Sequence, residues 1–469
     1  MIAALVILAG ALLLGWPIVL NGYPLVFIDT VSYLGQTLIP EWPWDKTPAY
    51  GAALHLFHWG VSLWPALLAQ LLALSHLLWL TQRAARGEAT IPGHLLLCGA
   101  LAAFTSAPWF AATLMPDIFA AVAPLCILLL GFALERLTRG ETAWLVILGA
   151  FATATHLSHL PTAVAMVLVV AVMGGGILPP LRAALPVALA VAALTGANAW
   201  AFGRASLSPH GAVFLLARLQ ADGPAAATIR ANCPASGWYL CAFASRLPMD
   251  SDAFLWDPQS PPNRRPDGRA IAMGGMRLAP EAAQIIERTL RERPLEVAEA
   301  MLHNTFRQLA MTEVGDTLGR EHLAASARRA IARLPPGELA SFDAGAQMRG
   351  TLRQDAAPFL AVHGPALMLA LPLALFALAL AAWQRDRLRG GLVAGMLVAV
   401  LVNAFATGAL SGPHNRYQAR IIWLVPLAAV LGLAPRFGPD LNEAARIRAR
   451  MAAWQTSSPS SRSSSSPAS

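Results

Sequence analysis

Residues 359–382 read FLAVHGPALMLALPLALFALALAA, an almost unbroken apolar run that decides the class of this chain. Such a run can cross the hydrocarbon core of a bilayer, which needs about 20 apolar residues. Similar windows recur along most of the 469 residues. The chain is 56% hydrophobic and 13% charged, with a mean hydropathy of +0.53, whereas soluble domains carry about 25% charged residues. These values exclude a soluble multidomain enzyme, a disordered scaffold and a disulfide-dense secreted module.

The hydropathy pattern predicts an all-α polytopic membrane protein with about ten transmembrane helices. The predicted spans cover residues 3–20, 60–80, 93–107, 117–134, 143–157, 161–177, 184–202, 359–382, 391–410 and 421–434.

These spans divide the chain into four parts. We expect a membrane module with a long first outer loop at 1–202, a mostly helical extracytoplasmic domain at 203–358, the last three spans at 359–434, and a cytoplasmic, disordered, Ser-rich tail at 435–469. Residues 280–311 carry apolar residues at helical spacing, interrupted at Pro294, which supports a helical fold for the second part.

The net charge of +8 reflects membrane topology. Arginines cluster in short loops near residues 83–86, 136–139, 182 and 385–389, and the positive-inside rule places such loops in the cytoplasm. The segment 203–358 carries nearly equal numbers of basic and acidic residues, as expected on the outer side. The basic excess therefore gives no support to nucleic-acid binding.

The four cysteines fall into two classes. Cys98 and Cys126 lie in apolar runs and are most simply interpreted as core residues. Cys233 and Cys241 lie in the polar segment NCPASGWYLC, where a disulfide fits an oxidising compartment. Zinc binding is the weaker alternative, because two further ligands are not evident.

Ionisable residues at the outer ends of spans are the candidates for chemistry, because charge near a membrane is costly unless it is paired or solvated. Asp29 follows the first span and Asp117 opens the fourth. Each also has an ordinary explanation, since Asp29 suits a solvated loop and Asp117, after Pro116, suits a helix N-terminus. Further polar and aromatic candidates at the same predicted level are Tyr33, Lys46, His156, His159, His414, Arg416, Tyr417 and Arg420.

The basic members of this set are suited to binding phosphate through charge-assisted hydrogen bonds. Snorkelling towards lipid headgroups is the alternative for Arg416 and Arg420, but two outer arginines break the local charge rule and favour an anionic partner. The H-x2-H spacing of His156 and His159 is a weak zinc signal, and a solvated helix end explains it equally well.

Five segments, in this order, resemble the motifs of GT-C glycosyltransferases, and within that class the chain is most similar to the aminoarabinose transferase and protein O-mannosyltransferase group. The segments are IDTVSY at 28–33, KTPAYGAALHLFHWG at 46–60, LMPDIFA at 114–120, HLSHLPTAV at 156–164 and NRYQARIIWLVPLAAVL at 415–431. The likeness covers roughly residues 1–175 and 410–434.

The chain departs from the family pattern at three positions. Thr30 follows Asp29 where the family often has a second acid, so a divalent metal stays an open alternative and no cofactor is expected with certainty. Thr47 replaces the first Pro of a Lys-Pro-Pro element, and His159 stands near a usual lysine.

The resemblance implies transfer of a sugar from a polyprenyl-phosphate donor to a glycan, lipid or protein acceptor. The reaction would occur at the outer face of a membrane, with the bacterial inner membrane and its periplasmic side as the expected location. Asp29 would act as general base, with Asp117 orienting or assisting the acceptor. Lys46, His159, Arg416 and Arg420 would hold the lipid phosphate. Trp42 and Trp44 fit either the polyprenyl path or an aromatic belt.

Other classes of function stay open on the sequence. Ten spans also suit a transporter or lipid flippase, although such proteins usually carry ionisable residues within the membrane and show internal repeats. A ligase that moves a whole polymer from its lipid carrier would differ only in its acceptor. A structural subunit without catalysis is the third alternative.

Overall fold

The computed structural model describes residues 2–39 and 44–435, and within them regular structure is helical apart from isolated bridges such as Leu25 with Thr113. The elements, in chain order, are α1 (Ile2–Leu14), α2 (Pro17–Asn21), α3 (Thr30–Leu38), α4 (Pro48–His58), α5 (Trp64–Arg86), α6 (Ile91–Phe104), α7 (Ala107–Ala111), η1 (Pro116–Ile118), α8 (Phe119–Phe132), η2 (Leu134–Arg136), α9 (Arg139–Ala154), α10 (His159–Met173), α11 (Leu178–Phe202), α12 (Ala212–Ala221), α13 (Pro224–Asn232), η3 (Tyr239–Arg246), α14 (Ser251–Trp256), α15 (Gly274–Glu292), α16 (Pro294–Ala310), α17 (Ala327–Ile331), α18 (Pro336–Asp343), α19 (Ala346–Arg349), α20 (Leu352–Leu360), α21 (His363–Trp383), α22 (Arg387–Ala404), η4 (Phe405–Ala409), α23 (Asn415–Ile422) and α24 (Leu424–Leu433).

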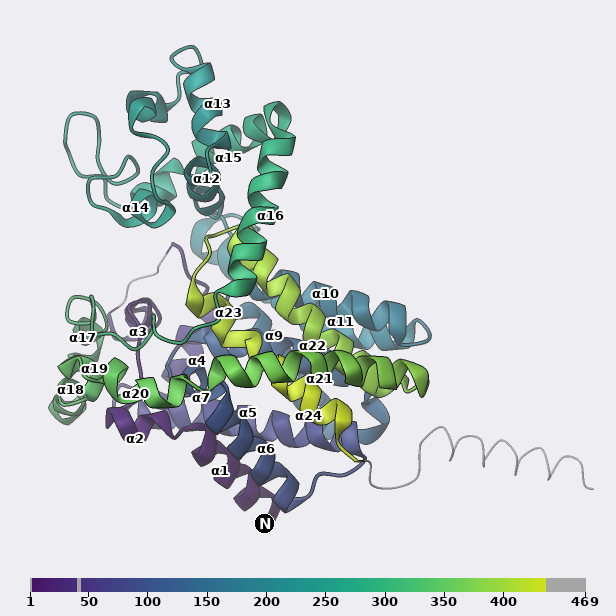
Figure 1. The fold of residues 1–469 in the computed structure, drawn as a ribbon. Coiled ribbons are helices and arrows are strands. Elements are labelled where there is room, and N and C mark those ends of the chain that lie inside the picture. The colour runs from purple at the N-terminus through teal and green to yellow at the C-terminus, as the bar shows by residue number, and fades with distance from the viewer. Residues whose placement is uncertain (1, 40–43, 436–469) are drawn as a thin grey trace, which may run out of the picture.

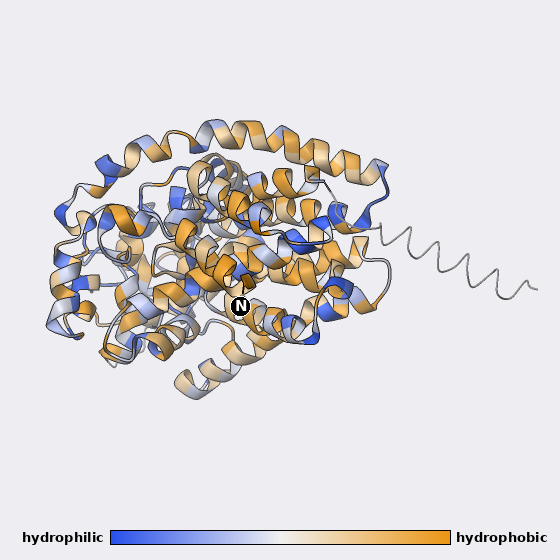
Figure 2. Cartoon of the chain, turned by 90° about the horizontal axis from the view of Figure 1, so that it is seen from below, coloured by the Kyte–Doolittle hydropathy of each residue, from blue (hydrophilic) through white to orange (hydrophobic). Residues whose placement is uncertain are grey.

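The helices form a lower bundle and a smaller group, α12 to α16, that stands above it (Figure 1). Viewed from below, the bundle helices are hydrophobic along most of their lengths (Figure 2). Within the described residues, four helical stretches are long and apolar enough to cross a membrane: Trp64–Arg86, Leu178–Phe202, Leu352–Trp383 and Arg387–Ala409. This composition and architecture are those of a helical membrane protein, as the sequence predicts.

Each of the ten predicted spans contains a helix, but most of these helices are shorter than a full crossing. Ile2–Leu14, Ile91–Phe104, Pro116–Phe132 and His159–Met173 are apolar helices below that length. The predicted span 3–20 is not one helix, because α1 ends at Leu14 and α2 begins at Pro17. Pro17 has no N–H to donate to the carbonyl one turn back, so the helix ladder is interrupted where α1 ends, although Trp16 itself keeps helical dihedral angles.

Helix α8 is the centre of the bundle. It is apolar all round, and every residue from Phe119 to Gly131 is buried, which is the pattern of a helix enclosed by other helices. It packs against α5, α9, α10, α11 and α22. Its N-terminal end, opened by Pro116 and Asp117, therefore lies at one end of the bundle interior.

The segment predicted as one domain at 203–358 contributes to two hydrophobic cores. Residues between Val213 and Val297 form a core of their own, which we call the outer domain core, because the helices of this outer domain, α12 to α16, lie outside the bundle. Residues between Val314 and Ala356 instead join the main core with the bundle. The predicted helical stretch at 280–311 is confirmed as α15 and α16, which are separated at Arg293 just before Pro294.

The two cysteines of the outer segment, Cys233 and Cys241, are joined by the predicted disulfide, whereas Cys98 and Cys126 are free and buried. The predicted Ser-rich tail, apart from Pro435, and Trp42 of the first loop lie outside the described residues.

Candidate functional site

Asp117 is the most buried acid of the candidate site, at the entrance to α8. Its side chain is 3% exposed and faces two arginines, with Oδ1 3.6 Å from Arg416 Nε and 3.4 Å from Arg420 Nη1. Among the contacts of the described residues, no backbone N–H of α8 binds this carboxylate. The structure therefore gives Asp117 a role as counterion to arginine, and not the capping role that its position after Pro116 suggested.

Helix α23 places both arginines on one face, because residues four apart lie one turn apart. The helix is fixed by side chains from two other segments and by one at its own C-terminal end. Asp316 Oδ2 accepts from Arg416 N at 3.0 Å, Ser106 Oγ donates to the Ala419 carbonyl, and Trp423 Nε1 donates to the Arg420 carbonyl. The two guanidinium groups are thus held in place before any ligand binds.

Aromatic rings cover the same guanidinium groups. Arg416 Cζ lies 4.4 Å from the ring centre of Phe27 and 4.9 Å from that of Tyr417, and Arg420 Cζ lies 5.2 Å from Tyr417. Such cation–π contacts are strongest where water is excluded.

The segment between α2 and α4 brings Asp29 and Lys46 to the arginines. Asp29 Oδ2 lies 3.4 Å from Arg416 Nη1, and Asp29 Oδ1 lies 3.4 Å from Lys46 Nζ. Lys46 Nζ also lies 3.3 Å from Asp45 Oδ2. The α2–α4 segment is anchored on the segment before α8, because Leu114 N donates to the Leu25 carbonyl.

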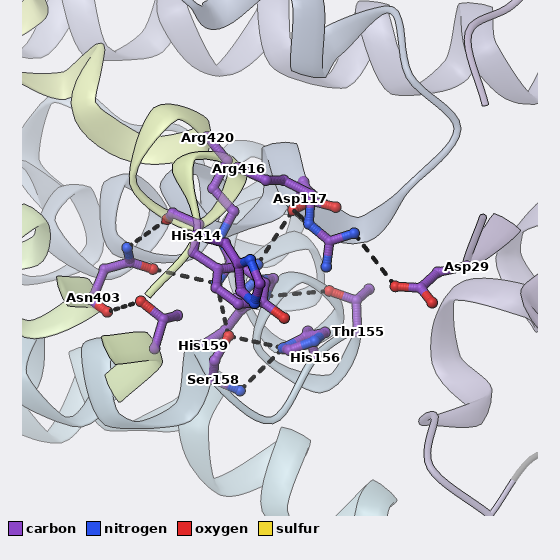
Figure 3. A network of polar contacts seen from close by, with 12 residues as sticks. Asp29, Asp117, Thr155, His156, Ser158, His159, Asn403, His414, Arg416 and Arg420 are labelled. Atoms are coloured by element: carbon purple, nitrogen blue, oxygen red, sulfur yellow. Dashed lines mark hydrogen bonds and ion pairs between the residues drawn. The ribbon is translucent and has the colours of Figure 1, made fainter. Parts of the chain in front are cut away.

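These contacts form one continuous chain of alternating charges, which we call the ion-pair chain: Asp45, Lys46, Asp29, Arg416, Asp117 and Arg420. Figure 3 shows Asp29 approaching from one side and Arg416 and Arg420 from the other, with Asp117 between the arginines. Three acids balance three cations. Asp29 is the acid open to a ligand, with a side chain 28% exposed.

The neighbouring cations set the protonation of Asp29. Burial alone would raise the pKa of its carboxyl, but Lys46 and Arg416 outweigh this effect and hold the pKa below its usual value. Burial would likewise lower the pKa of Lys46, but Asp29 and Asp45 raise it above its usual value. Both side chains are therefore charged at neutral pH.

Neutral polar groups complete the buried end of the chain at Arg420. Its Nη2 donates to Ser158 Oγ at 2.8 Å and to Asn403 Oδ1 at 3.3 Å. His156 Nδ1 and Ser158 Oγ share a further hydrogen bond of 2.8 Å. His159 Nδ1 donates to the Ala152 carbonyl at 2.8 Å, which leaves its Nε2 buried and without a partner among the described residues.

The structure brings together most of the residues that the sequence singled out. Asp29, Lys46, Asp117, Arg416 and Arg420 form the ion-pair chain, and the ring of Tyr417 lies beside it. His156 and His159 lie beside its buried end (Figure 3). Five further residues contact the ion-pair chain but were not singled out from the sequence: Asp45, Ser158, Asn403, Asp316 and Phe27.

Two candidates make other contacts. The ring of Tyr33 packs edge-on against Tyr50, with 5.2 Å between ring centres. His414 Nε2 lies 3.3 Å from Asp252 of α14, in the outer domain, although its ring also contacts Tyr417.

Metal-ligating side chains do not gather at this site. In residues 2–39 and 44–435, no group of three or more His, Cys, Asp or Glu side chains is arranged to hold a metal ion. The site offers a partly exposed carboxylate flanked by fixed cations, which suits an anionic group and an adjacent hydroxyl.

No family model matches the chain, and comparisons with curated proteins and with solved structures give no match either.

Trp44 connects the Lys46 segment to the outer domain. Its indole lies on Phe214 of α12 with 5.6 Å between ring centres and close to Trp256 at 6.1 Å. A Cβ on Gly275 of α15 would collide with the same ring, so glycine is needed there. Trp44 therefore packs on the outer domain core, two residues before Lys46.

We expect Trp44→Ala to loosen this connection, because truncating a packed Trp typically costs about 3–5 kcal/mol where the side chain is fully buried and somewhat less here. Limited proteolysis of the full chain should cut the outer domain at least several-fold faster than in the parent. Trp383→Ala is the matched control, since Trp383 is 82% exposed at the end of α21. Equal proteolysis of parent and Trp44→Ala would contradict the connection.

Proposed function

We propose that this protein is an integral-membrane glycosyltransferase that moves a sugar from a polyprenyl-phosphate donor to an acceptor hydroxyl. One observation carries the proposal: Asp29 and Lys46 from the first loop, Asp117 from the entrance of α8 and Arg416 from α23 converge in one partly exposed cluster. The order of these segments along the chain is also the order in which the sequence resembles GT-C enzymes.

In this proposal the donor phosphate binds Lys46 and Arg416. Arg420 and His159, which were also expected to hold the phosphate, are each only 1% exposed and are not assigned to it. Lys46 and Arg416 then share their charge between the phosphate and Asp29, so the pKa of Asp29 rises from its depressed value and the carboxylate becomes a better base. The exchange of partners couples donor binding to activation of Asp29.

The transfer step then needs one general base for the acceptor hydroxyl and cationic side chains that bind the leaving phosphate. Asp29 takes the proton of the acceptor hydroxyl as the oxygen attacks the anomeric carbon. The bond from that carbon to the phosphate oxygen breaks, and polyprenyl phosphate leaves with the electron pair, stabilised by Lys46 and Arg416. Asp117 holds Arg416 and Arg420 in position. A single displacement of this kind inverts the anomeric centre.

A cavity of about 570 Å³, which Ile422 lines at the C-terminal end of α23, supports a lipid-linked donor. Its apolar lining includes Phe104, Leu367, Ile422, Trp423 and Pro426. Glu313 and Arg353 are exposed side chains of the same cavity, so it combines apolar and charged walls, as an amphiphilic ligand requires.

The proposed topology has ten membrane crossings with both termini in the cytoplasm. It places residues 203–358 and the ion-pair chain on the outer face, with the bacterial inner membrane and its periplasmic side as the proposed location. Clustered arginines in the opposite loops support this orientation. The Cys233–Cys241 disulfide is in keeping with an oxidising compartment.

The direct test is turnover by the purified full chain in nanodiscs with a polyprenyl-phosphate sugar. We expect release of polyprenyl phosphate together with a glycosylated acceptor. Translocation of an intact donor, with no release from any tested sugar, would instead identify a flippase and overturn the proposal.

Topology is tested separately by reporter fusions near Gly268 and near Arg387. We expect the two positions to report opposite sides of the membrane, with Gly268 outside. A fusion near Arg139 is the control and should agree with Arg387. If Gly268 and Arg387 report the same side, the proposed number of crossings is wrong.

A further inference from the structure

A second cavity, of about 540 Å³, lies in the outer domain and shares no lining residue with the ion-pair chain. It is an open surface cavity lined by η3, by the long connection between α14 and α15, and by the first turns of α15, in the upper group of helices (Figure 1). Four charged residues line it: Arg265, Asp267, Arg277 and Glu281.

The two acids of this cavity already have hydrogen-bond partners. Glu281 accepts from Tyr239 N at 2.6 Å and from Leu240 N at 3.0 Å, one bond to each carboxylate oxygen. Asp267 Oδ1 accepts from Arg269 N at 3.0 Å, and its Oδ2 lies 3.7 Å from the Arg269 guanidinium.

The two arginines of the cavity, in contrast, lack such partners among the described residues. In the part of the chain that the structure describes, the guanidinium groups of Arg265 and Arg277 have no hydrogen bond or ion pair. The unused hydrogen-bonding capacity of the cavity is therefore that of donors, although its formal charges balance.

The walls of the cavity are held rigidly. Tyr239 Oη lies 3.0 Å from the Pro261 carbonyl and 2.9 Å from the Arg264 carbonyl, which ties the connection to η3. A Cβ on Gly274 would collide with the Pro262 carbonyl, so the connection lies directly on the start of α15. The disulfide at Cys241 fixes the chain two residues from Tyr239. A ligand would thus meet a preformed site.

We propose that this cavity binds a saccharide that carries a carboxylate or a phosphate. Its volume lies in the range of small-molecule sites, about 300–1,000 Å³. The two guanidinium forks match carboxylate or phosphate oxygens. Pro262, Pro266 and Ile271 give apolar faces on which the C–H groups of a sugar ring pack. The proposal does not depend on the glycosyltransferase activity.

The cavity also adjoins the segment that carries Lys46. Gly274 lines the cavity, and the next residue, Gly275, is in contact with the ring of Trp44. A ligand bound here is held on the same structural unit that positions Lys46.

Binding is measured with the purified full chain in nanodiscs, without any lipid donor, by saturation-transfer NMR. The probes are glucuronate, glucose 1-phosphate and uncharged glucose. We expect at least one charged probe to bind at least 10-fold more tightly than glucose, and the probe that binds identifies the anionic group.

The test variant is the double substitution Arg265→Gln/Arg277→Gln, which should weaken binding of the charged probe at least 10-fold. Arg288→Gln/Arg291→Gln is the control, because these exposed arginines of α15 pair with Glu292 and Glu287 and do not line the cavity. The same measurement on Asp29→Asn should give unchanged binding, which separates this site from the transferase proposal.

Three outcomes would overturn the proposal: equal binding of all three probes, no binding of either charged probe, or undiminished binding by the Arg265→Gln/Arg277→Gln variant. Retention of the Cys233–Cys241 disulfide, measured by intact mass after alkylation, confirms that the variants keep the fold of the cavity wall.

Discussion

Replacement of Asp29 by Asn should reduce sugar transfer by about 10²-fold or more, because the amide keeps the shape of the side chain but cannot take a proton from the acceptor. Donor affinity should be unchanged or slightly tighter. Asp29 competes with the donor phosphate for Lys46 and Arg416, which lie 3.4 Å from its two oxygens. The measurement is a comparison of turnover at saturating donor with the dissociation constant of the donor.

Asp45 supplies a matched control for this variant. It lies 3.3 Å from the same Lys46 and its side chain is 11% exposed, but it makes no contact with Arg416. Asp45→Asn should therefore keep most of the turnover. Lys46→Ala and Arg416→Ala should instead weaken donor binding and turnover together. Full transfer by Asp29→Asn from an isolated lipid donor would show that Asp29 is not the base.

The class of the fold and the convergence of the site could be predicted from the sequence, for a simple physical reason. Apolar runs specify helices that must bury or embed their surfaces, and alternating arginine loops assign their ends to two sides. Asp29, Asp117 and Arg416, far apart in the chain, all follow or precede such runs at ends assigned to the same side. Their proximity in the structure is what the predicted topology requires.

The neutral partners of the site carried no comparable signal. Ser158 and Asn403 both contact Arg420, but a single uncharged polar residue in or near an apolar helix does not change its hydropathy pattern. Asp45 was overlooked for another reason. It stands beside Lys46 in the sequence, where an acid is most simply a solvated loop residue, and only the folded loop shows it as the outer end of the ion-pair chain.

The amino-acid composition of residues 203–358 also could not predict that this segment is divided between two hydrophobic cores. The stretch after α16 is as polar as the outer domain, yet it packs on the first loop through specific pairs. Gln347 Nε2 donates to the Val26 carbonyl at 2.7 Å, and Tyr23 Oη donates to Glu338 Oε2 at 2.5 Å. Pairings between residues more than 300 positions apart are decided by tertiary structure and have no local signature.

Asp117→Asn should cause the largest loss of stability at the site, about 3–5 kcal/mol, because breaking a buried ion pair leaves an uncompensated buried charge. The Arg420 side chain is 1% exposed, and Asp117 is its carboxylate partner among the described residues. Arg416 is less affected, since Asp29 stays 3.4 Å away. Equilibrium unfolding in mixed micelles measures the difference, and Glu287→Gln, in an exposed pair with Arg291, is the control expected to show no change.

A double variant separates the missing charge from a general defect of packing. Arg420→Met removes the buried cation while keeping a long side chain, so Asp117→Asn/Arg420→Met should recover at least half of the stability lost in Asp117→Asn. Stability losses that simply add would mean that the two side chains do not act as a pair. A fully stable Asp117→Asn variant would contradict the predicted loss of stability itself. It would show that Ser158, Asn403 and the ring of Tyr417 suffice to hold the Arg420 guanidinium, and that Asp117 does not anchor α23.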